Sequence, residues 1–491
     1  MKQVFFIITI FPLFFFFSCV EKETVITGKV IGNADRLFYS NPNEGTCYAG
    51  FRDTIQIDES GNFELKFKLK QPSFILLWTS APYKESKLLI EHGKKYHIII
   101  DMENGIEILG DNEEGQRLYA TLPNPSFISM QSKDLQKENS LIVIHDKIQE
   151  KKSEELEKFQ KLYDENKISN SFFELIKKDR DCYYASLESR ILQIKMYGFT
   201  PSEDGKYILD NGEDLLENLS NIYAQYPPGQ NDFLISSFWP EYAQHFIEDY
   251  KPFSQKDFNI EKLRELHKNR QLNMFYVNES KKYLAGKSLE FFYATYMYRA
   301  SIQNMFEKDL ISLFTEYKKD YPQSKYTSYI EPYVEEIVSY YEKVDRDYGD
   351  NISFVEHFEN INTLKEAIKP LDGKMIYVDV WATWCGPCKE EFKHSEALKK
   401  ILKENDIQMF YISIDDKERD AQWREMIKGF ALEGKHIRAN EKFDQELRFL
   451  YDDKPGSISI PWYMLIDEKG NILKKHAKRP SEIVSGESIF E

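Results

Sequence analysis

Two cysteines that follow an apolar run constrain the fold and the chemistry of this chain more than any other feature. Residues 374–383 contain a β-branched, apolar stretch, and Cys385 and Cys388 come where a helix is expected to begin. A thiolate at a helix N-terminus is stabilised by free backbone N–H groups and by the helix dipole, which lowers its pKa toward ~7 or below. Pro387 suits the first helical turn, where a missing N–H costs nothing. We expect Cys385 to be the exposed, attacking sulfur and Cys388 to close a disulfide with it.

Other uses of a Cys-x-x-Cys pair fit this sequence less well. A zinc site would need further ligands, but there is no second Cys-x-x-Cys, and the close pair His92 and His97 lies far away in a strand-rich region. Covalent haem attachment needs a histidine after the second cysteine, where the chain has Lys389. A purely structural disulfide would be strained at this spacing. We therefore expect a redox pair that uses no metal and no cofactor.

Residues 378–389 read Val-Asp-Val-Trp-Ala-Thr-Trp-Cys-Gly-Pro-Cys-Lys. They resemble the thioredoxin superfamily signature, Val-Asp-Phe-Trp-Ala-x-Trp-Cys-Gly-Pro-Cys-Lys, and only Val380 departs from a fixed position. The resemblance covers the last third of the chain. It implies that Asp379 is a buried acid beneath the disulfide, which takes the proton from Cys388 when that thiol attacks. It also implies substrate contacts from Trp384, Gly386 and Pro387.

A second element near the C-terminus carries the same resemblance. Residues 459–473 read as a hairpin, with two apolar runs around the turn sequence Asp-Glu-Lys-Gly. Thioredoxin-like proteins place a cis-proline at the start of the first strand, against the active disulfide, and Pro461 matches it. Ile460 then occupies the substrate-facing position before it, while Trp462 stands where the family often has threonine. An ordinary trans proline that opens an edge strand is the alternative.

The N-terminus predicts the compartment. Lys2 precedes an apolar stretch at 4–17 that is too brief for a comfortable membrane span, and a small residue stands before Cys19. This resembles a bacterial lipoprotein signal over residues 1–18, with Cys19 as the lipid-modified first residue of the mature chain. Phe16 and Phe17 depart from the usual pattern. Secretion with cleavage nearby and an uncleaved anchor are the alternatives, and each places the remaining chain outside the cytoplasm.

Composition limits the class of partner and the number of cores. A formal net charge of −16 disfavours nucleic acid as a partner. With 491 residues, of which 42% are hydrophobic, two or three cores are expected. No further membrane span is expected in so polar a chain.

Periodicity divides the mature chain into three parts, which makes the fold class multidomain. Residues 19–112 alternate as short strands and predict an antiparallel β-sandwich, similar to the N-terminal domain of unassigned function in many envelope lipoproteins. Residues 113–345 have helical periodicity and predict an α-helical region. Cys47 falls in a probable loop of the first part and Cys182 on an apolar helical stripe of the second, and whether the two pair is open.

Residues 346–491 predict an α/β domain of thioredoxin-like fold with a four- or five-stranded mixed sheet. A short helix over 363–369 is expected to begin at Asn362 as N-cap. Strands at 375–380 and 408–415, helices at 421–431 and 442–451, and the hairpin complete the order. The long insertion between 415 and 461 and the lipoprotein signal make this similar to the TlpA-type envelope branch. His394 and His436 are candidate acid–base groups, although His394 is expected on a solvated helix face.

These patterns predict a membrane-anchored thiol-disulfide oxidoreductase of the cell envelope, facing the periplasm. The Gly-Pro pair between the cysteines resembles reducing thioredoxins, which favours reduction of protein disulfides over oxidation. A membrane-bound thiol reductant would then have to recharge the protein in an oxidising compartment. Two alternatives are a ligand- or protein-binding lipoprotein whose redox domain is accessory, and a thiol peroxidase, whose cysteine context differs from Trp-Cys-Gly-Pro-Cys.

Overall fold

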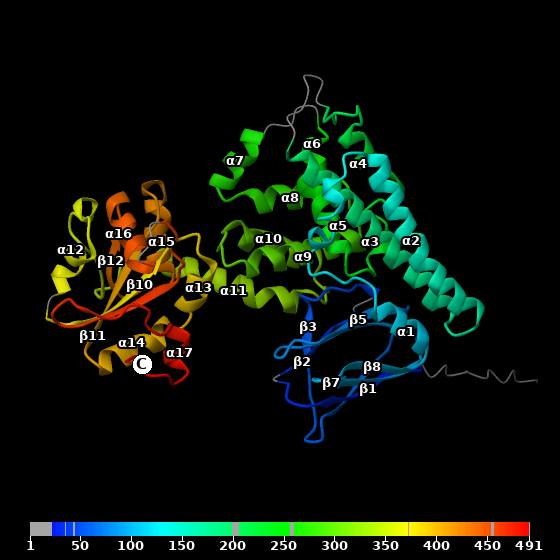
Figure 1. Ribbon diagram of the computed structural model, residues 1–491, viewed down its shortest axis with the longest axis horizontal. Coiled ribbons are helices and arrows are strands. Elements are labelled where there is room, and N and C mark those ends of the chain that lie inside the picture. The colour runs from blue at the N-terminus through cyan, green and yellow to red at the C-terminus, as the bar shows by residue number, and fades with distance from the viewer. Residues whose placement is uncertain are drawn as a thin grey trace, which may run out of the picture. The chain divides into compact units, whose positions relative to one another are not determined.

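The computed structural model describes residues 22–34, 36–42, 45–198, 206–255, 260–371, 373–452 and 456–490 (Figure 1). The predicted signal at 1–18 and the predicted lipidation site Cys19 lie outside the described residues. Within the described ranges, no helix is long and apolar enough to cross a membrane. The chain forms two compact units, one of Met1–Asn259 with Asn278–Thr295 and one of Ile260–Val277 with Tyr296–Glu491.

Eight strands near the N-terminus form two four-stranded sheets. They are β1 (Thr24–Ile31), β2 (Leu37–Ser40), β3 (Arg52–Ile55), β4 (Asn62–Phe67), β5 (Ser73–Thr79), β6 (Glu85–Ile90), β7 (Lys95–Asp101) and β8 (Gly105–Gly110). The strand orders are β4-β1-β7-β8 and β3-β2-β5-β6. Side chains of both sheets share one core, Ile26 and Ile98 from the first with Leu37 and Ile75 from the second. The two sheets therefore pack face to face as a sandwich.

The prediction of a purely antiparallel sandwich is wrong for one pair of strands. β1 pairs with β7 in parallel, from Val25 opposite Lys95 to Ile31 opposite Asp101. The chain reaches β7 from β6, which belongs to the other sheet, so β7 follows no hairpin with β1 and is free to run in the same direction.

β5 is buried on both of its faces because the first unit has a second core. Ile75 and Leu77 point into the sandwich, whereas Phe74, Leu76 and Trp78 pack against helices. This continuous apolar run is typical of a strand covered on both sides. The helices of this unit are α1 (Glu113–Ala120), α2 (Leu141–Asp164), α3 (Asn170–Met196), α4 (Leu215–Gln225), α5 (Trp239–His245) and α6 (Lys251–Phe253), with a π-helical turn at Phe246–Tyr250 between the last two.

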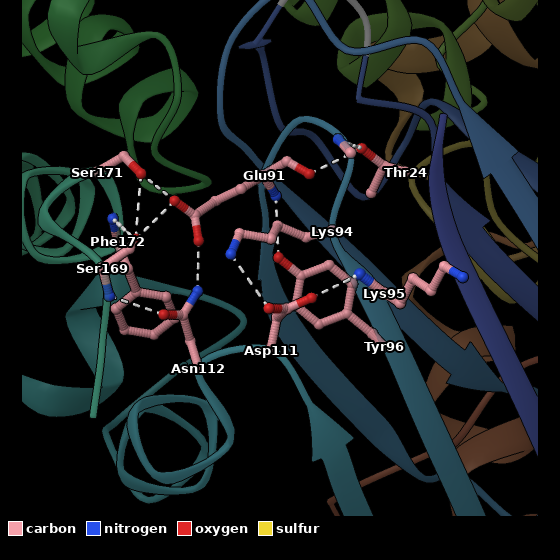
Figure 2. Close-up of polar contacts among 11 residues, drawn as sticks. Thr24, Glu91, Lys94, Lys95, Tyr96, Asp111, Asn112, Ser169, Ser171 and Phe172 are labelled. Atoms are coloured by element: carbon pink, nitrogen blue, oxygen red, sulfur yellow. Dashed lines mark hydrogen bonds and ion pairs between the residues drawn. The ribbon is translucent and has the colours of Figure 1, made fainter. Parts of the chain in front are cut away.

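A buried carboxylate ties the sandwich to the start of α3 (Figure 2). Glu91 follows β6, and its side chain accepts hydrogen bonds from the hydroxyl of Ser169 at 2.7 Å and from Ser171 and Asn112. Ser169 is the N-cap of α3, since its hydroxyl also accepts from the N–H of Phe172 at 3.0 Å. A carboxylate at this end of a helix is stabilised by the helix dipole. Sheet and helix are thus one packed structure.

Helices α10 (Asp309–Asp320) and α11 (Thr327–Val344) lie in the second unit, together with α7 (Ile260–Lys268). Helices α8 (Leu272–Ser280) and α9 (Lys287–Ile302) pass from one unit to the other. Within the second unit α11 packs on α15 (Asp420–Gly429), where the Tyr340 ring lies over Gly429. A Cβ on Gly429 would come within 2.0 Å of that ring, so the close approach requires glycine.

The C-terminal sheet has six strands, β9 (Ile352–Phe354), β10 (Met375–Trp381), β11 (Ile407–Ser413), β12 (Gly434–Arg438), β13 (Trp462–Ile466) and β14 (Ile472–Lys474). Their order is β14-β13-β10-β11-β12-β9. β10, β11, β12 and β9 run parallel. β13 runs antiparallel to β10, and β14 runs antiparallel to β13. The helices are α12 (Leu364–Ile368), α13 (Gly386–Phe392), α14 (Ser395–Glu404), α15, α16 (Glu441–Asp452) and α17 (Pro480–Val484).

Two details of this domain differ from the prediction. The sheet is larger than four or five strands because β12 forms within the insertion and β9 forms ahead of the first strand that was predicted. Neither strand is long or strongly alternating, so each depends on the neighbouring edge for its hydrogen bonds. The N-cap of α12 is Thr363 rather than Asn362, since the Thr363 hydroxyl accepts from the N–H of Glu366 at 3.2 Å.

Candidate active site

The cysteine pair sits where β10 ends and α13 begins. β10 is buried along nearly its whole length, and Cys385 is the N-cap of α13. Cys385 and Cys388 are disulfide-bonded, with their Cα atoms 5.4 Å apart. The backbone N–H of Cys388 donates to Cys385 Sγ at 3.1 Å. The sulfur therefore occupies the position of a capping acceptor, which would stabilise a thiolate after reduction.

Exposure distinguishes the two sulfurs less sharply than predicted. Cys385 is 4% exposed and Cys388 is 0% exposed, so Cys385 is nearly buried in this oxidised state rather than fully exposed. The residues around the pair are open to solvent: Trp384 is 52% exposed, and Gly386 and Pro387 are also exposed. A partner disulfide can approach Cys385 across this exposed segment.

Asp379 lies in β10 beneath this segment and is almost fully buried. Its register partners are Tyr411 on β11 and Tyr463 on β13, so a phenol flanks the carboxyl on each side. Burial raises the pKa of Asp379 well above its usual range, Glu391 adds to the rise, and Tyr463 opposes it. In the described part of the chain neither Asp379 Oδ1 nor Tyr463 Oη has a hydrogen-bond partner. Burial therefore makes this carboxylate a stronger base than an exposed one.

Glu391 is fixed close to this carboxyl by the C-terminal segment. It belongs to α13, and it accepts hydrogen bonds from the N–H and the hydroxyl of Ser481 at 2.9 Å and 3.0 Å. Ser481 lies in the first turn of α17. The negative charge of Glu391 is thus held in place by a helix N-terminus while it disfavours ionisation of Asp379.

Pro461 brings the hairpin to the same end of the sheet. The Ile460–Pro461 peptide bond is cis, and β13 starts at the next residue, with Trp462 opposite Val380 of β10. The segment therefore lies beside the end of β10, from which the cysteine loop departs. Ile460 and Pro461 are half-buried, and they line a cavity of about 200 Å³ together with Tyr451 and His476, among others.

Comparison with known proteins agrees with this geometry. Residues 356–487 match the family model described as Redoxin. This range is therefore similar to the Redoxin family, and it includes the cysteine pair, Asp379 and the hairpin. The thiol-disulfide oxidoreductase ResA of Bacillus thuringiensis subsp. konkukian is 27% identical over 111 residues, which are 23% of this chain and 59% of the relative. The thioredoxin of Ictalurus punctatus is 36% identical over 62 residues, 13% of this chain and 58% of the relative.

The Redoxin model matches only residues 356–487 of the chain. This chain spans between a half and two thirds of the length of these curated relatives. A solved thiol:disulfide interchange protein of the thioredoxin family from Chlorobium tepidum TLS is 19% identical, with a TM-score of 0.21, over 24% of this chain and 81% of that chain.

Two residues of the thioredoxin-like domain that sequence reasoning missed support the cysteine loop. Asp415 is buried and accepts from the N–H of Thr383 at 2.9 Å and from its hydroxyl at 2.7 Å. Ser413 donates to the same carboxylate at 2.8 Å. These bonds fix the loop between β10 and α13. A polar residue directly after an apolar parallel strand was the available signal.

Lys389, which follows the second cysteine, is also buried. Its ammonium donates to Met305 Sδ at 3.4 Å, a weak interaction. The pKa of Lys389 is lowered to about 8, mainly by burial and to a smaller extent by the positive charge of Arg270. The lysine therefore changes charge near neutral pH, close to the disulfide. The sequence does not predict the burial of Lys389, because a lysine at this position looks like a surface residue. The burial follows from the packing of Met305 on α13.

The remaining candidate groups are two histidines and two further cysteines. His436 is fully buried, stacks on Tyr411 at 4.7 Å, and has its pKa lowered to about 3 by burial, so it stays neutral. His394 is partly exposed and precedes α14. Cys47 and Cys182 are buried free thiols, and burial raises the pKa of both. Among the described residues no group of three or more His, Cys, Asp or Glu could hold a metal ion.

Proposed function

We propose that the protein is an envelope thiol-disulfide oxidoreductase that reduces disulfide bonds of client proteins. The observation that carries this proposal is the Cys385–Cys388 disulfide at the N-terminus of α13, above the buried Asp379. The match of residues 356–487 to Redoxin and the similarity to ResA support it. Because the chain covers only part of those relatives, clients and partners follow from the chemistry of the site alone.

The reaction starts from the dithiol form. The Cys385 thiolate attacks a client disulfide, which forms a mixed disulfide and releases one client thiolate. The Cys388 thiol then gives its proton to the Asp379 carboxylate and attacks Cys385 Sγ. The second client thiol leaves, and the 385–388 disulfide forms. Two electrons pass from the cysteine pair to the client, and the client takes up two protons.

Tyr463 and Asp379 act together in the second step. Only the ionised carboxylate accepts a proton, and its raised pKa makes it a stronger base than an exposed carboxylate. The Tyr463 phenol favours the ionised form because it lowers the pKa of Asp379. Tyr463 also lines the cavity beside Pro461, so a proton on Asp379 has a short way to solvent. Tyr463 is thus a positioning residue that acts through Asp379.

The exposed residues around Cys385 are the ones that contact a client protein. Trp384, Gly386 and Pro387 give exposed surface around Cys385, and the family resemblance assigns Ile460 the substrate-facing position before Pro461. A membrane-bound thiol reductant restores the dithiol, and a lipid on Cys19 holds the protein at the periplasmic side of a membrane. These two partners follow from the sequence resemblance, and the anchor is tested below.

The test is capture of clients by a resolution-defective variant. Cys388→Ser in the native envelope should accumulate mixed disulfides on Cys385, which reductant releases. Cys385→Ser should trap nothing and should lose reduction of a small disulfide substrate, whereas Cys182→Ser should behave as wild type. Retained activity in Cys385→Ser would overturn the proposal. A reduction potential near about −270 mV would support reduction, and one near about −120 mV would indicate an oxidant instead.

A further inference from the structure

Two buried cations lie side by side in the first unit, far from the cysteine pair in sequence. Lys87 of β6 is 6% exposed and Arg180 of α3 is 1% exposed. Both contact one carboxylate, Asp179: the Lys87 ammonium at 3.2 Å and Arg180 Nη2 at 2.9 Å. Buried cations are costly unless each is paired and hydrogen-bonded. This cluster therefore has one carboxylate for two positive charges at its centre.

Asp179 has no acceptor position left for a further hydrogen bond. Its carboxylate also accepts from the hydroxyls of Tyr119 and Ser236, both at 2.7 Å. Burial alone would raise the pKa of Asp179, but Lys87 and Arg180 bring it down to about 2, so it stays ionised. Glu155 is the next carboxylate. Its Oε2 lies 3.5 Å from Arg180 Nη1 without forming a hydrogen bond.

Several buried donors are consequently left over. In the part of the chain that the structure describes, Arg180 Nε and Nη1 and the hydroxyl of Ser86 have no hydrogen-bond partner. The Lys87 ammonium lies over the rings of Phe74 and Phe238, at 4.6 Å and 4.8 Å. Such orphaned donors in a native protein require an explanation, because each unmade bond costs free energy.

The donors line a cavity of about 260 Å³. Lys87, Arg180 and Ser86 are buried lining residues, Tyr119, Leu122 and Pro123 add apolar surface, and exposed residues such as Glu85, Asn124 and Ser126 also border it. The cavity is smaller than the usual range for drug-sized ligands, roughly 300–1,000 Å³. It therefore fits a short group rather than a folded surface.

We propose that this cavity binds a small carboxylate, either a short-chain acid or the C-terminal carboxylate of a peptide. The oxygens of a carboxylate can accept hydrogen bonds from guanidinium and hydroxyl donors that lack partners. A monoanion suits a wall that carries Lys87 and Arg180, whose positive charges are shared with Asp179 and Glu155, and the nearby carboxylate of Glu85 disfavours a dianion such as phosphate. The apolar surface accommodates a short aliphatic tail. This site is independent of thiol-disulfide exchange.

A network whose only role is to join β6 to α3 would not be expected to leave buried donors without partners. The Lys87–Asp179 contact already links strand and helix, and a purely structural cluster would satisfy the guanidinium as well. Arg180 and Ser86, the residues that carry these orphaned donors, instead border a cavity.

The experiment is a titration of the purified full chain, followed by NMR and calorimetry. The probes are butyrate, its uncharged counterpart butyramide, and N-acetyl-alanyl-alanine as free acid and as amide. We expect saturable binding of butyrate or of the peptide acid, and binding of the matching amide that is at least about tenfold weaker. Binding of butyrate assigns a free acid as the source, and binding of the peptide acid alone assigns a C-terminus.

Two substitutions at exposed positions test the cavity without disturbing the buried cluster. Ser126→Trp fills the cavity from an exposed position and should abolish binding, while thiol-disulfide exchange stays unchanged. Ser153→Trp, exposed on α2 and not part of the cavity lining, is the matched control and should bind as wild type. Equal affinity for acid and amide, no binding up to ~10 mM, or normal binding by a folded Ser126→Trp would each overturn the proposal.

Discussion

Asp379 of β10 and Tyr463 of β13 are register partners in an antiparallel pair, and both are almost fully buried. In the described residues Asp379 Oδ1 and Tyr463 Oη each lack a hydrogen-bond partner. A buried carboxyl with an unbonded Oδ1 lies beside a buried phenol on the neighbouring strand, and the phenol affects the pKa of the carboxyl. Three of the predictions concern this pair.

Asp379→Asn keeps the shape of the side chain and removes its titration. Initial attack of Cys385 on a small disulfide should change little, whereas resolution by Cys388 should slow about tenfold or more at pH 7 through loss of the base. Stopped-flow kinetics across pH would separate the two steps. Resolution that matches wild type throughout would show that Asp379 is only a structural polar residue.

The same substitution should change the pH dependence of stability. The pKa of Asp379 is raised in the folded protein from an unfolded value of 3.8, so its contribution to stability is present below that value. It is lost as the pH rises through the folded pKa. Asp379→Asn removes this loss, so the oxidised variant should be more stable than wild type at alkaline pH. Denaturant unfolding at several pH values measures the difference. A constant difference across pH would contradict the shift.

Tyr463→Phe should move the pH profile of resolution upward. The phenol lowers the pKa of Asp379, so its loss leaves the carboxyl protonated to a higher pH. Tyr377→Phe is the matched control, because Tyr377 stacks on Tyr463 at 5.5 Å but donates its hydroxyl to Lys478 O. Tyr377→Phe should keep the wild-type profile. Identical profiles for both variants and wild type would exclude a role for the Tyr463 phenol.

Cys385 should be alkylated much faster than Cys388, Cys47 or Cys182 in the reduced protein at neutral pH. It alone combines contact with solvent and a helix N-terminus, while burial raises the pKa of Cys47 to about 11. Brief iodoacetamide treatment followed by mass spectrometry gives the rates. Preferential labelling of Cys47 or Cys182 would refute the assignment of the attacking sulfur.

Cys19→Ser should release the protein from the membrane fraction or leave it unprocessed, because none of the described helices can span a membrane. Fractionation and the apparent mass of the variant provide the readout. Unchanged size together with membrane retention would mean that Cys19 carries no lipid.

Local patterns predicted a large part of the redox domain. The apolar run before Cys385, Pro387 at the first helical turn, and the turn at 467–470 each specify backbone that a few neighbouring residues determine. Helical periodicity likewise predicted residues 113–345 to be helical, and α1 to α11 lie in that range. The cis peptide at Pro461 came from resemblance rather than from local physics.

What the sequence by itself determined is therefore the chemistry that lies close together in the chain: the cysteine pair, the helix that it caps, and the acid six residues before it. Only the tertiary structure decided which distant side chains surround these groups. Strand register placed Tyr411 and Tyr463 beside Asp379, and it buried His436 as a neutral ring. The packing of β6 on α3 likewise set Lys87 beside Arg180 around one carboxylate. The reason is physical: a register shift of one residue turns every side chain to the other face of a sheet, and no local pattern encodes which register several strands share.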